Sequence, residues 1–497
     1  MKIRRFKLLS FLIAAIVLNA ACVSLQVNPV SGNKRAFGYS WEQEKQIGAE
    51  ADQEITAQFG LYENEELTNY VDQLGQELLE VSHLRREGVD EQFQNTEFTF
   101  RVLNSPVVNA FALPGGYVYV TRGLLSHLNN EAQLAVVLGH EIGHVAARHA
   151  SQRAAEQQFG QLAIIGGALL GQSVGLDGGN ILQLSSQTAQ LLFLKYGRDD
   201  ERESDELGVE YSAMKNYEAA EGAAFFTSLK RISEEGGGGI PTLLSTHPDP
   251  GEREQTIPRL AKAWEEEGYE QTILDKEEFM SMIEGITFGE NPREGFEQDG
   301  VFYHPDLEFR FPVPNGFSLV NQPSSVVMFN ENQDAIIQFS IDAESNSPQS
   351  SVQSFTNQEG ITTVGQGDIS VNGISGYQEE AMAQMEDGSE LQILVSALSY
   401  SNNIYTFLSY TTADQFANYG STFNSVVQGF DDVTDPEILN VEPVRLELRE
   451  VSQSQRFSDL LPNNLPMNFT PMDLAIINQV ELDETIEAGT TLKIPVQ

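Results

Sequence analysis

The sequence predicts a multidomain α+β protein, in which a mainly helical domain with a small sheet precedes an α+β domain and a small C-terminal domain. At 497 residues the chain is long enough for about three domains. Helical spacing of apolar residues dominates up to about residue 285, whereas strand-like alternation dominates after about residue 295. An apolar fraction of 40% with 28 Phe indicates a folded chain despite a net charge of −43.

Charge and cysteine content exclude several classes of site. A surface this acidic repels phosphate backbones, so no nucleic-acid partner is expected. The single cysteine excludes an intramolecular disulfide, a Cys-based zinc finger and an iron–sulfur site.

Residues 1–21 have the composition of a secretory signal peptide. Four basic residues and no acidic ones precede or flank an apolar run that ends at Leu18. This run is too short to count on as a spanning helix. The expected protein is therefore exported.

The only cysteine, Cys22, directly follows the small residues that end the signal. This arrangement resembles the lipobox of bacterial lipoproteins, in which the cysteine is lipidated, although Asn19 stands where Leu is usual. Lipidation would anchor the protein to the membrane without a span, and Val23 after the cysteine favours the outer membrane. An ordinary cleaved signal with an incidental cysteine is the alternative.

Each remaining region has its own pattern. Residues 22–40 are polar and predict a lipid-anchored tether. Helices are expected over residues 41–60 and 65–81, and strands over 98–102 and 117–121. The expected domain boundaries are 41–295 for the helical domain, 300–432 for the α+β domain and 438–497 for the small C-terminal domain.

A metal site is predicted at His140-Glu141-Ile-Gly-His144. Asn130 can cap a helix that carries this segment, so the two histidines lie one turn apart on one face. Their nitrogens can then reach one Zn²⁺ at about 2.1 Å, with Glu141 beside the metal as a general base. Gly139 and Gly143 weaken a helix and are explained if another backbone or a substrate comes close. Two surface histidines on a solvated helix are the alternative.

A second helix is expected to begin near Arg198 and carries Glu201 and Asp205 on one face. A carboxylate at Glu201 would complete a three-ligand catalytic site with an open position for water. Asp205 could orient a ligating histidine. Taken alone, this acidic stretch would be read as a solvated helix face.

Residues 41–265 resemble family forty-eight of the metallopeptidases, the gluzincins that include HtpX, the CaaX prenyl proteases and the BepA-type proteases. Four segments carry this resemblance in the family's order. They are Asn109-Ala-Phe-Ala-Leu-Pro-Gly-Gly116, His140–His144, Glu201-x-x-x-Asp205 after Tyr196-Gly-Arg198, and Ser245-Thr-His247-Pro-Asp-Pro-Gly-Glu-Arg253. Gly197 and Ser204 depart from the family's usual Ser and Ala.

The resemblance implies a zincin-type metallopeptidase fold and a set of residue roles. His140, His144 and Glu201 would bind one Zn²⁺, Glu141 would be the general base, and Asp205 would lie behind the ligands. His247 would either close the open metal position or stabilise the oxyanion, and a helix-capping turn is its plain structural reading. Asn109, Gly115 and Gly116 would lead into the strands that hold the substrate backbone.

His149 and the apolar segment 159–171 are expected to have structural rather than catalytic roles. His149, five residues after His144, is expected at the surface. The apolar segment 159–171 is expected to be a core helix, with a mobile lid over the cleft as the alternative.

The two C-terminal regions resemble binding modules. Residues 300–432 are similar to PsbP/Mog1-like domains and show no catalytic constellation, so a binding or spacer role is expected. Residues 438–497 resemble a diverged LysM module through Leu474–Asn478 and Ile486–Pro495, but the usual Gly-Asp-Thr is replaced by Ser452-Gln-Ser454. Peptidoglycan contact is one expectation for this region, and a LysM-like fold without glycan binding is the alternative.

The sequence therefore predicts a zinc-dependent endopeptidase of the bacterial envelope that acts in protein quality control, with unfolded or misassembled envelope proteins as substrates. One alternative is a periplasmic scaffold or chaperone-like lipoprotein with a closed metal site. Another is a peptidoglycan-binding protein with a cryptic hydrolase.

Overall fold

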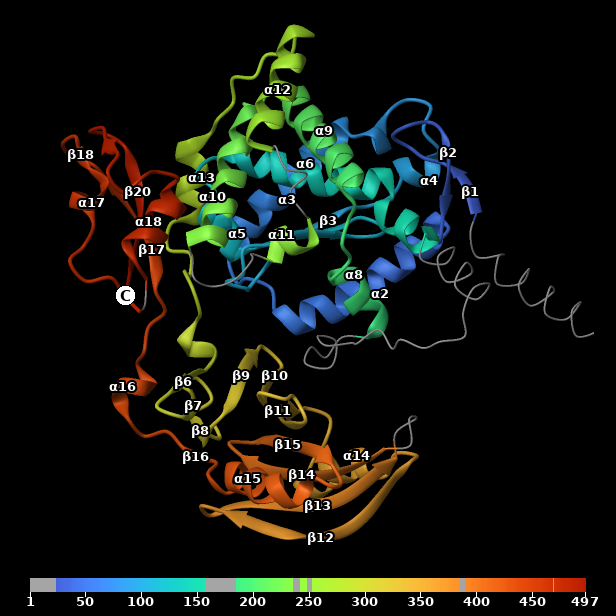
Figure 1. Ribbon diagram of the computed structural model, residues 1–497, viewed down its shortest axis with the longest axis vertical. Coiled ribbons are helices and arrows are strands. Elements are labelled where there is room, and N and C mark those ends of the chain that lie inside the picture. Colours follow the sequence, from blue (N-terminus) through green and yellow to red (C-terminus); the bar gives the residue numbers. More distant parts are fainter. Residues whose placement is uncertain (1–23, 157–184, 236–241, 248–252, 385–388, 468) are drawn as a thin grey trace, which may run out of the picture. The chain divides into compact units, whose positions relative to one another are not determined.

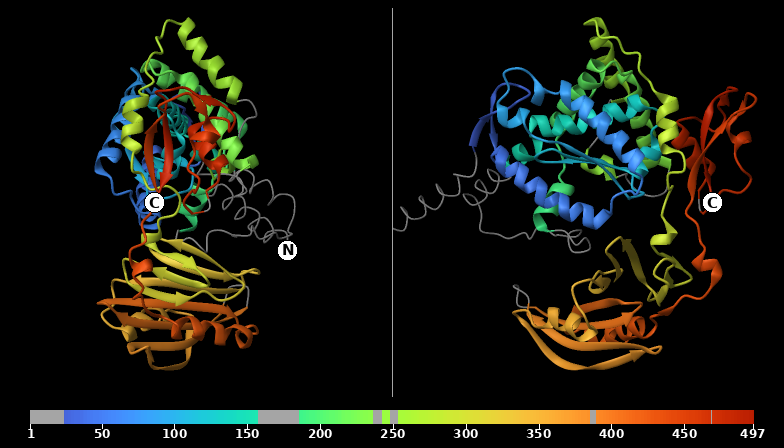
Figure 2. Two further views of the ribbon diagram at one scale, coloured as in Figure 1. Left: turned by 90° about the vertical axis from the view of Figure 1, so that its left-hand side faces the viewer. Right: turned by 180° about the vertical axis from the view of Figure 1, so that it is seen from behind.

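The computed structural model describes residues 24–156, 185–235, 242–247, 253–384, 389–467 and 469–497. Unit 1 is the chain up to Gly289 together with Val444–Gln497, and unit 2 is Glu290–Pro443. Helices and sheets combine in more than one domain, which confirms the predicted fold class (Figure 1, Figure 2). The expected signal peptide, Cys22 and the segment 159–171 lie outside the described residues.

Unit 1 is built around helix α6, all of whose residues are buried. Helices α3, α9 and α10 pack on it. The longer helices are α2 (Trp41–Phe59), α3 (Glu65–Val81), α6 (Glu131–Ala147), α9 (Arg198–Met214), α10 (Gly222–Glu235) and α12 (Arg253–Glu266). The shorter ones are α4 (Glu91–Gln94), α5 (Arg122–His127), α8 (Ser186–Leu192), α11 (Thr242–Thr246) and α13 (Lys276–Ile283).

Both ends of α6 are fixed by local backbone chemistry. The Asn130 side chain accepts a hydrogen bond of 2.9 Å from the amide of Gln133, as expected for an N-cap. At the other end Arg148 adopts the left-handed conformation with φ 60°, which stops the helix. Residues 149–156 then begin a new helical stretch in another direction.

A three-stranded sheet supports the N-terminal half of unit 1. Its order is β3 (Thr99–Leu103), β5 (Tyr117–Thr121), β4 (Ala110–Leu113), with β3 parallel and β4 antiparallel to β5. Strand β4 is therefore an edge strand, and it packs against α6. Both strands expected from alternation are present, the first shifted by one residue.

Residues 24–37 differ from the plain tether that composition predicts. Strands β1 (Ser24–Val27) and β2 (Lys34–Phe37) pair antiparallel, and we call them with their connecting turn the N-terminal hairpin. Asn28 in the turn is fully buried and donates to the carbonyl oxygen of Ala147 at 2.8 Å. The hairpin thus packs on the C-terminal end of α6.

The C-terminal segment Val444–Gln497 belongs to unit 1. It contains β17 (Arg445–Glu450), β18 (Gln455–Arg456), α17 (Phe457–Leu460), α18 (Pro471–Asn478), β19 (Thr485–Ile486) and β20 (Thr491–Val496). Val444, Leu446 and Ile477 join the main apolar core of unit 1. Buried Lys493 donates to the carbonyl oxygens of Ser126 and Leu128 at 2.7 and 2.8 Å, which joins β20 to the end of α5.

Unit 2 is a twisted antiparallel sheet with helices on it. The seven-stranded sheet has the order β12-β13-β14-β15-β11-β10-β9, and a second sheet has the order β16-β8-β7-β6. The strands are β6 (Phe296–Gln298), β7 (Val301–His304), β8 (Phe309–Pro312), β9 (Phe317–Gln322), β10 (Ser325–Asn330), β11 (Ala335–Asp342), β12 (Ile361–Val371), β13 (Ile374–Gln384), β14 (Glu390–Tyr400), β15 (Asn403–Thr412) and β16 (Asp431–Asp432). The helices are α14 (Pro348–Thr356), α15 (Phe416–Gln428) and α16 (Pro436–Leu439).

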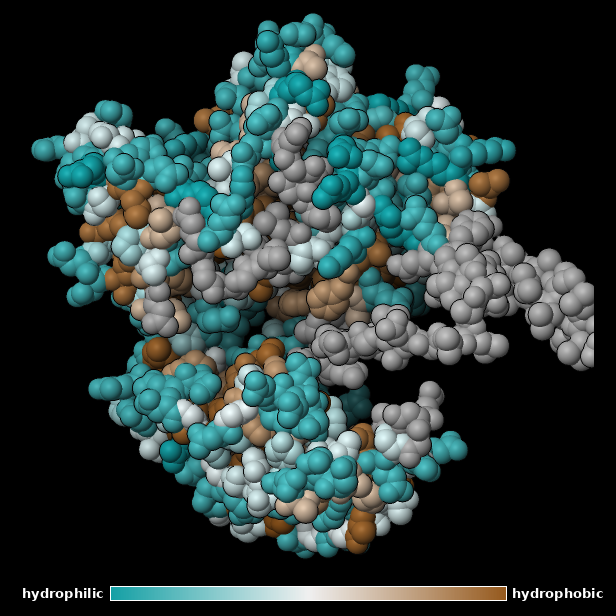
Figure 3. Space-filling view, viewed as in Figure 1, coloured by the Kyte–Doolittle hydropathy of each residue, from teal (hydrophilic) through white to brown (hydrophobic). Residues whose placement is uncertain are grey.

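The surface agrees with the composition. Hydrophilic residues dominate the face drawn in Figure 3, as a net charge of −43 leads one to expect. Within the described ranges, no helix has both the length and the apolar character needed to cross a membrane.

Candidate metal centre

Two glycines let α6 and α9 approach closely. A Cβ atom added at Gly139 would lie 3.0 Å from the carbonyl oxygen of Gly208, and one at Gly208 would lie 2.9 Å from that of Val136. The backbone of α9 therefore occupies the space beside Gly139. Of the two reasons expected for a glycine here, a neighbouring backbone or a bound substrate, the structure shows the first. This close approach brings the acidic face of α9 against the histidines of α6.

Four buried side chains converge where these helices meet. His140 and His144 come from α6, Glu201 from α9, and His247 from the residue after α11. One ligand atom from each lies within 4.8 Å of the others. The Nε2 atoms of His140 and His144 are 3.0 Å apart, and Nδ1 of His247 lies 3.3 Å from Oε1 of Glu201.

These distances fit a tetrahedral cation such as zinc. Ligands at about 2.1 Å from a tetrahedral metal lie about 3.4 Å from one another. Nε2 of His140 is 3.4 Å from Nδ1 of His247, and Nε2 of His144 is 3.5 Å from Oε1 of Glu201. Among the described residues this Glu201 oxygen has no hydrogen bond, although it is buried. A cation would satisfy it, and three nitrogens with one carboxylate oxygen are a donor set that zinc accepts.

Asp205 and Arg253 contact the donor residues His140 and Glu201 from behind. Oδ1 of Asp205 lies 3.0 Å from Nδ1 of His140, so the carboxylate can fix that imidazole. The buried Arg253 donates to Asp205 at 2.9 Å and to Glu201 at 2.6 Å. Burial alone would raise the pKa of Glu201, but His247, His140 and Arg253 lower it to about 2. Arg253 lies in a segment that the sequence singles out, yet its two carboxylate partners become visible only in the fold.

Glu141 lies beside the four donors and not among them. Its side chain is buried, and Oε1 is 3.9 Å from Nε2 of His247. Oε2 has no hydrogen bond within the part of the chain that the structure describes. Burial raises the pKa of Glu141, while His247 and His140 act in the opposite direction. A carboxylate in such surroundings can exchange a proton readily.

The expectation that His149 lies at the surface is wrong. Its ring is fully buried, with Nδ1 only 3.0 Å from Nδ1 of His144. Continued helical spacing would point it away, but α6 ends at Arg148 and the chain changes direction there. The Tyr196 ring also lies on His144, with ring centres 3.9 Å apart. Helices often end at a glycine, but α6 ends at Arg148. The sequence therefore gave no signal that the helix stops there and that His149 lies against His144.

The residues expected at a substrate site flank strand β4, Asn109 just before it and Gly115 and Gly116 just after it. Asn109 is buried, and its backbone pairs with Thr121 on β5. Gly115 and Gly116 form the turn between β4 and β5, with φ 85° and 106°. Side chains there would collide with α2 and with Phe98, so packing accounts for both glycines. The structure does not bring these two glycines into the metal-donor cluster.

Comparisons with known proteins agree with this site. A model described as Peptidase family M48 matches residues 67–261. The chain is 27% identical over 256 residues to the β-barrel assembly-enhancing protease of Escherichia coli, covering 50% of each protein. It is 32% identical over 157 residues to the mitochondrial metalloendopeptidase OMA1 of Arabidopsis thaliana, covering 31% of this chain and 30% of that protein.

The chain therefore spans between 30% and 50% of the length of these curated relatives. Among solved structures, it is similar to cyanobacterial PsbP from Synechocystis, with 18% identity, a TM-score of 0.23, and coverage of 27% of this chain and 91% of that one. The family match contains α6 and α9 and hence His140, His144 and Glu201. The part of this chain that carries the site is thus the part that is similar to peptidase family M48.

Proposed function

We propose that this protein is a zinc-dependent endopeptidase of the bacterial cell envelope. The observation that supports this most strongly is the buried set of His140, His144, Glu201 and His247, with Glu141 beside it, whose Oε2 has no hydrogen bond among the described residues. Three protein ligands with a nearby carboxylate are what metal-assisted peptide hydrolysis requires. Zinc is the proposed metal because of its preference for this nitrogen-rich donor set.

In this proposal each residue has one task. Zinc, when bound by His140, His144 and Glu201, supplies Lewis acidity for the peptide carbonyl and the attacking water. Glu141 takes the proton from that water and later delivers it to the leaving amine. Asp205 holds the His140 ring. The edge strand β4, which follows Asn109, holds the substrate backbone by strand addition.

The substrates and location are also proposed. The similarity to a protease named for β-barrel assembly supports misassembled envelope proteins as substrates, and hence a role in quality control. The signal-like residues 1–21 and the cysteine after them support export and a lipid anchor at Cys22 in the outer membrane.

The variant Glu141→Gln tests the reaction. It should bind one zinc per chain like the wild type and lose at least about 100-fold of its cleavage of an unfolded protein, because no group then accepts the proton. Zinc content by elemental analysis and digestion of reduced casein measure the two properties. Asp199→Asn, on the exposed side of α9, is the control and should leave both unchanged. Undiminished cleavage by Glu141→Gln would falsify the assigned role.

One observation favours a second function, that of a scaffold or chaperone-like protein. Nδ1 of His247 lies within reach of the same centre as the three ligands, and four protein ligands leave no position for water. His247→Ala distinguishes the two. If His247 closes the site, this variant should cleave faster than the wild type; if His247 stabilises the oxyanion, it should cleave about 100-fold more slowly.

If the wild type and His247→Ala both bind zinc but neither cleaves protein, the scaffold function is favoured instead. Peptidoglycan pull-down with the full-length protein tests the proposed glycan contact of the LysM-like region, and a protein that stays in the supernatant would contradict this contact.

A further inference from the structure

The N-terminal hairpin is joined to the C-terminal end of α6 by polar contacts from several residues. Besides the bond from Asn28, the amide of Gly38 donates to the carbonyl oxygen of Ser151 at 2.8 Å. The guanidinium of Arg148 lies 3.9 Å from the centre of the Phe37 ring and donates to the carbonyl oxygen of Tyr39. The hairpin is therefore built into the end of the helix that carries both histidine ligands.

One further chain of contacts leads from this hairpin to the proposed metal ligand His144. Arg35 on β2 makes two parallel hydrogen bonds to Glu203 on α9, at 3.1 and 3.2 Å. Oε2 of Glu203 lies 3.0 Å from Nε2 of His149. Nδ1 of His149 lies 3.0 Å from Nδ1 of His144, and the His149 ring is completely buried.

A single proton arrangement satisfies every link. Nε2 of His144 faces the donor cluster, 3.0 Å from Nε2 of His140. A neutral imidazole that binds a metal through Nε2 carries its hydrogen on Nδ1. That hydrogen can be donated to Nδ1 of His149, whose own hydrogen is then on Nε2 and points at Glu203. Ser204 Oγ, 3.4 Å from Nδ1, and Asp200, 3.9 Å from Nε2, are the other polar neighbours of the ring.

We propose that His149 is a positioning residue that fixes the ring and tautomer of His144, and that Arg35 of the N-terminal hairpin holds His149 in place through Glu203. The inference rests on the proposed metal function, because it assigns a role toward a bound zinc ion. In this proposal the N-terminal hairpin, which follows Cys22, supports the metal centre. A plain tether would have no such role.

The test measures how fast zinc leaves the purified full-length protein when a chromogenic chelator is in excess. Removal of an outer partner of a histidine ligand typically costs about 10–100-fold in metal affinity. His149→Ala should therefore release zinc about 10–100-fold faster than the wild type. His149→Asn, which keeps an acceptor near the position of Nδ1, should recover most of this loss. Arg35→Ala should give an intermediate increase.

Arg86→Ala is the matched control for Arg35→Ala. Arg86 pairs with Glu210 on the same helix α9, and the two arginine side chains are similarly exposed, at 37% and 34%. Its removal should leave the release rate unchanged. The visible spectrum of the cobalt-substituted protein adds a readout of ligand geometry, which should change in His149→Ala and not in Arg86→Ala.

The outcomes separate the two proposals. If the wild type binds zinc and cleaves protein, but His149→Ala releases zinc at the wild-type rate, the positioning role is wrong and the proposed function stands. If Arg35→Ala and Arg86→Ala release zinc at equal rates, Arg35 of the N-terminal hairpin does not help to position His149. If His149→Ala fails to fold, the comparison of His149→Asn and Arg35→Ala with the wild type decides. A wild type without zinc would overturn both proposals together.

Discussion

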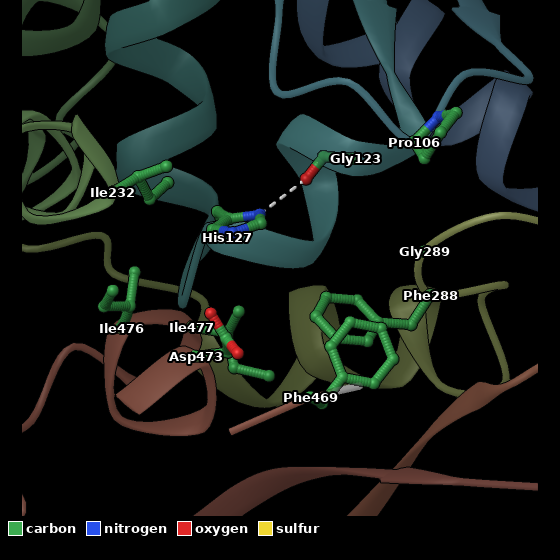
Figure 4. Close-up of a pocket in the computed structure, with 10 residues that line it drawn as sticks. All are labelled: Pro106, Gly123, His127, Ile232, Phe288, Gly289, Phe469, Asp473, Ile476 and Ile477. Carbon is green, nitrogen blue, oxygen red and sulfur yellow. Dashed lines mark hydrogen bonds between the residues drawn. The ribbon is translucent and has the colours of Figure 1, made fainter. Parts of the chain in front are cut away.

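His127, the last residue of α5, shows how a single side chain can set the acid sensitivity of unit 1. Its ring lines a cavity of about 170 Å³ between α5 and α18, and Nδ1 contacts the carbonyl oxygen of Gly123 at 2.8 Å (Figure 4). Burial, with a smaller contribution from Lys493, lowers the pKa of His127 to about 4, although the contacts with Gly123 and Asp473 oppose this shift. The native ring is therefore neutral at pH values where a free histidine is protonated.

This shift predicts a loss of stability in acid. Between pH 6.5 and pH 4 the unfolded chain binds a proton at His127 that the native state does not, so stability falls as the pH falls through this window. The expected contribution is about 1–2 kcal/mol, because a pKa unit corresponds to about 1.4 kcal/mol and the ring retains some solvent access. Urea unfolding at several pH values should show a shallower pH dependence for His127→Asn. Parallel curves for variant and wild type would contradict this.

At the scale of elements, the crossing of α6 and α9 decides whether the proposed metal ligands meet. Glu201 lies on α9, His140 and His144 lie on α6, and the close approach at Gly139 and Gly208 sets their separation. A Cβ atom at Gly208 would also lie 3.0 Å from the amide nitrogen of His140. Backbone atoms cannot move aside as a flexible side chain can.

Gly208→Ala should therefore cost both stability and zinc binding. Alanine favours a helix by about 1 kcal/mol over glycine, but overpacking between helices costs about 1–3 kcal/mol. We expect a net loss of up to about 2 kcal/mol and about 10-fold weaker zinc binding, measured by urea unfolding and chelator competition. Gly143→Ala is a milder comparison, because its closest neighbour is the side chain of Leu207 at 3.1 Å. Unchanged zinc binding in Gly208→Ala would show that the crossing distance is not critical.

Elements with their own sequence signals could be predicted, and those that depend on tertiary contacts could not. The helices at 41–59 and 65–81 and the capped start of α6 agree with the apolar spacing and with Asn130. The N-terminal hairpin was missed because its strands have four residues each and are held by α6 rather than by an apolar pattern of their own.

The same distinction applies to the site. The spacing of His140 and His144 predicts their meeting, since four residues make about one helical turn. The roles of His149 and Arg253 depend on a left-handed residue at Arg148 and on helix α12, and neither follows from local spacing.

At the scale of the whole molecule, unit 2 is inserted into unit 1. The amide of Phe288 donates to the carbonyl oxygen of Val444 at 2.8 Å, so the two points where the chain leaves and re-enters unit 1 are adjacent. The apolar core of unit 1 contains Val444, Leu446 and Ile477, so its last segment is part of its fold.

Replacement of residues 290–443 by a short Gly-Ser linker should leave unit 1 folded and able to bind zinc. The two backbone segments that the linker joins are already hydrogen-bonded neighbours, so loop closure costs little. Thermal unfolding and zinc content are the measurements. Deletion of residues 444–497 is the comparison and should prevent folding, since it removes core residues and the buried contacts of Lys493. A linker variant that stays unfolded while retaining 444–497 would contradict the division into units.

The insertion of unit 2 also sets the order in which the protein can mature during synthesis. Trp41 is among the first residues of the core of unit 1 to be made, and Ile477 is among the last. A ribosome that adds about 5–20 residues per second makes all of unit 2 in between, which takes about 8–30 s. Unit 1 can complete its core only after this interval. A nascent chain thus carries an unfinished unit 1, with its candidate metal site, until translation is nearly over.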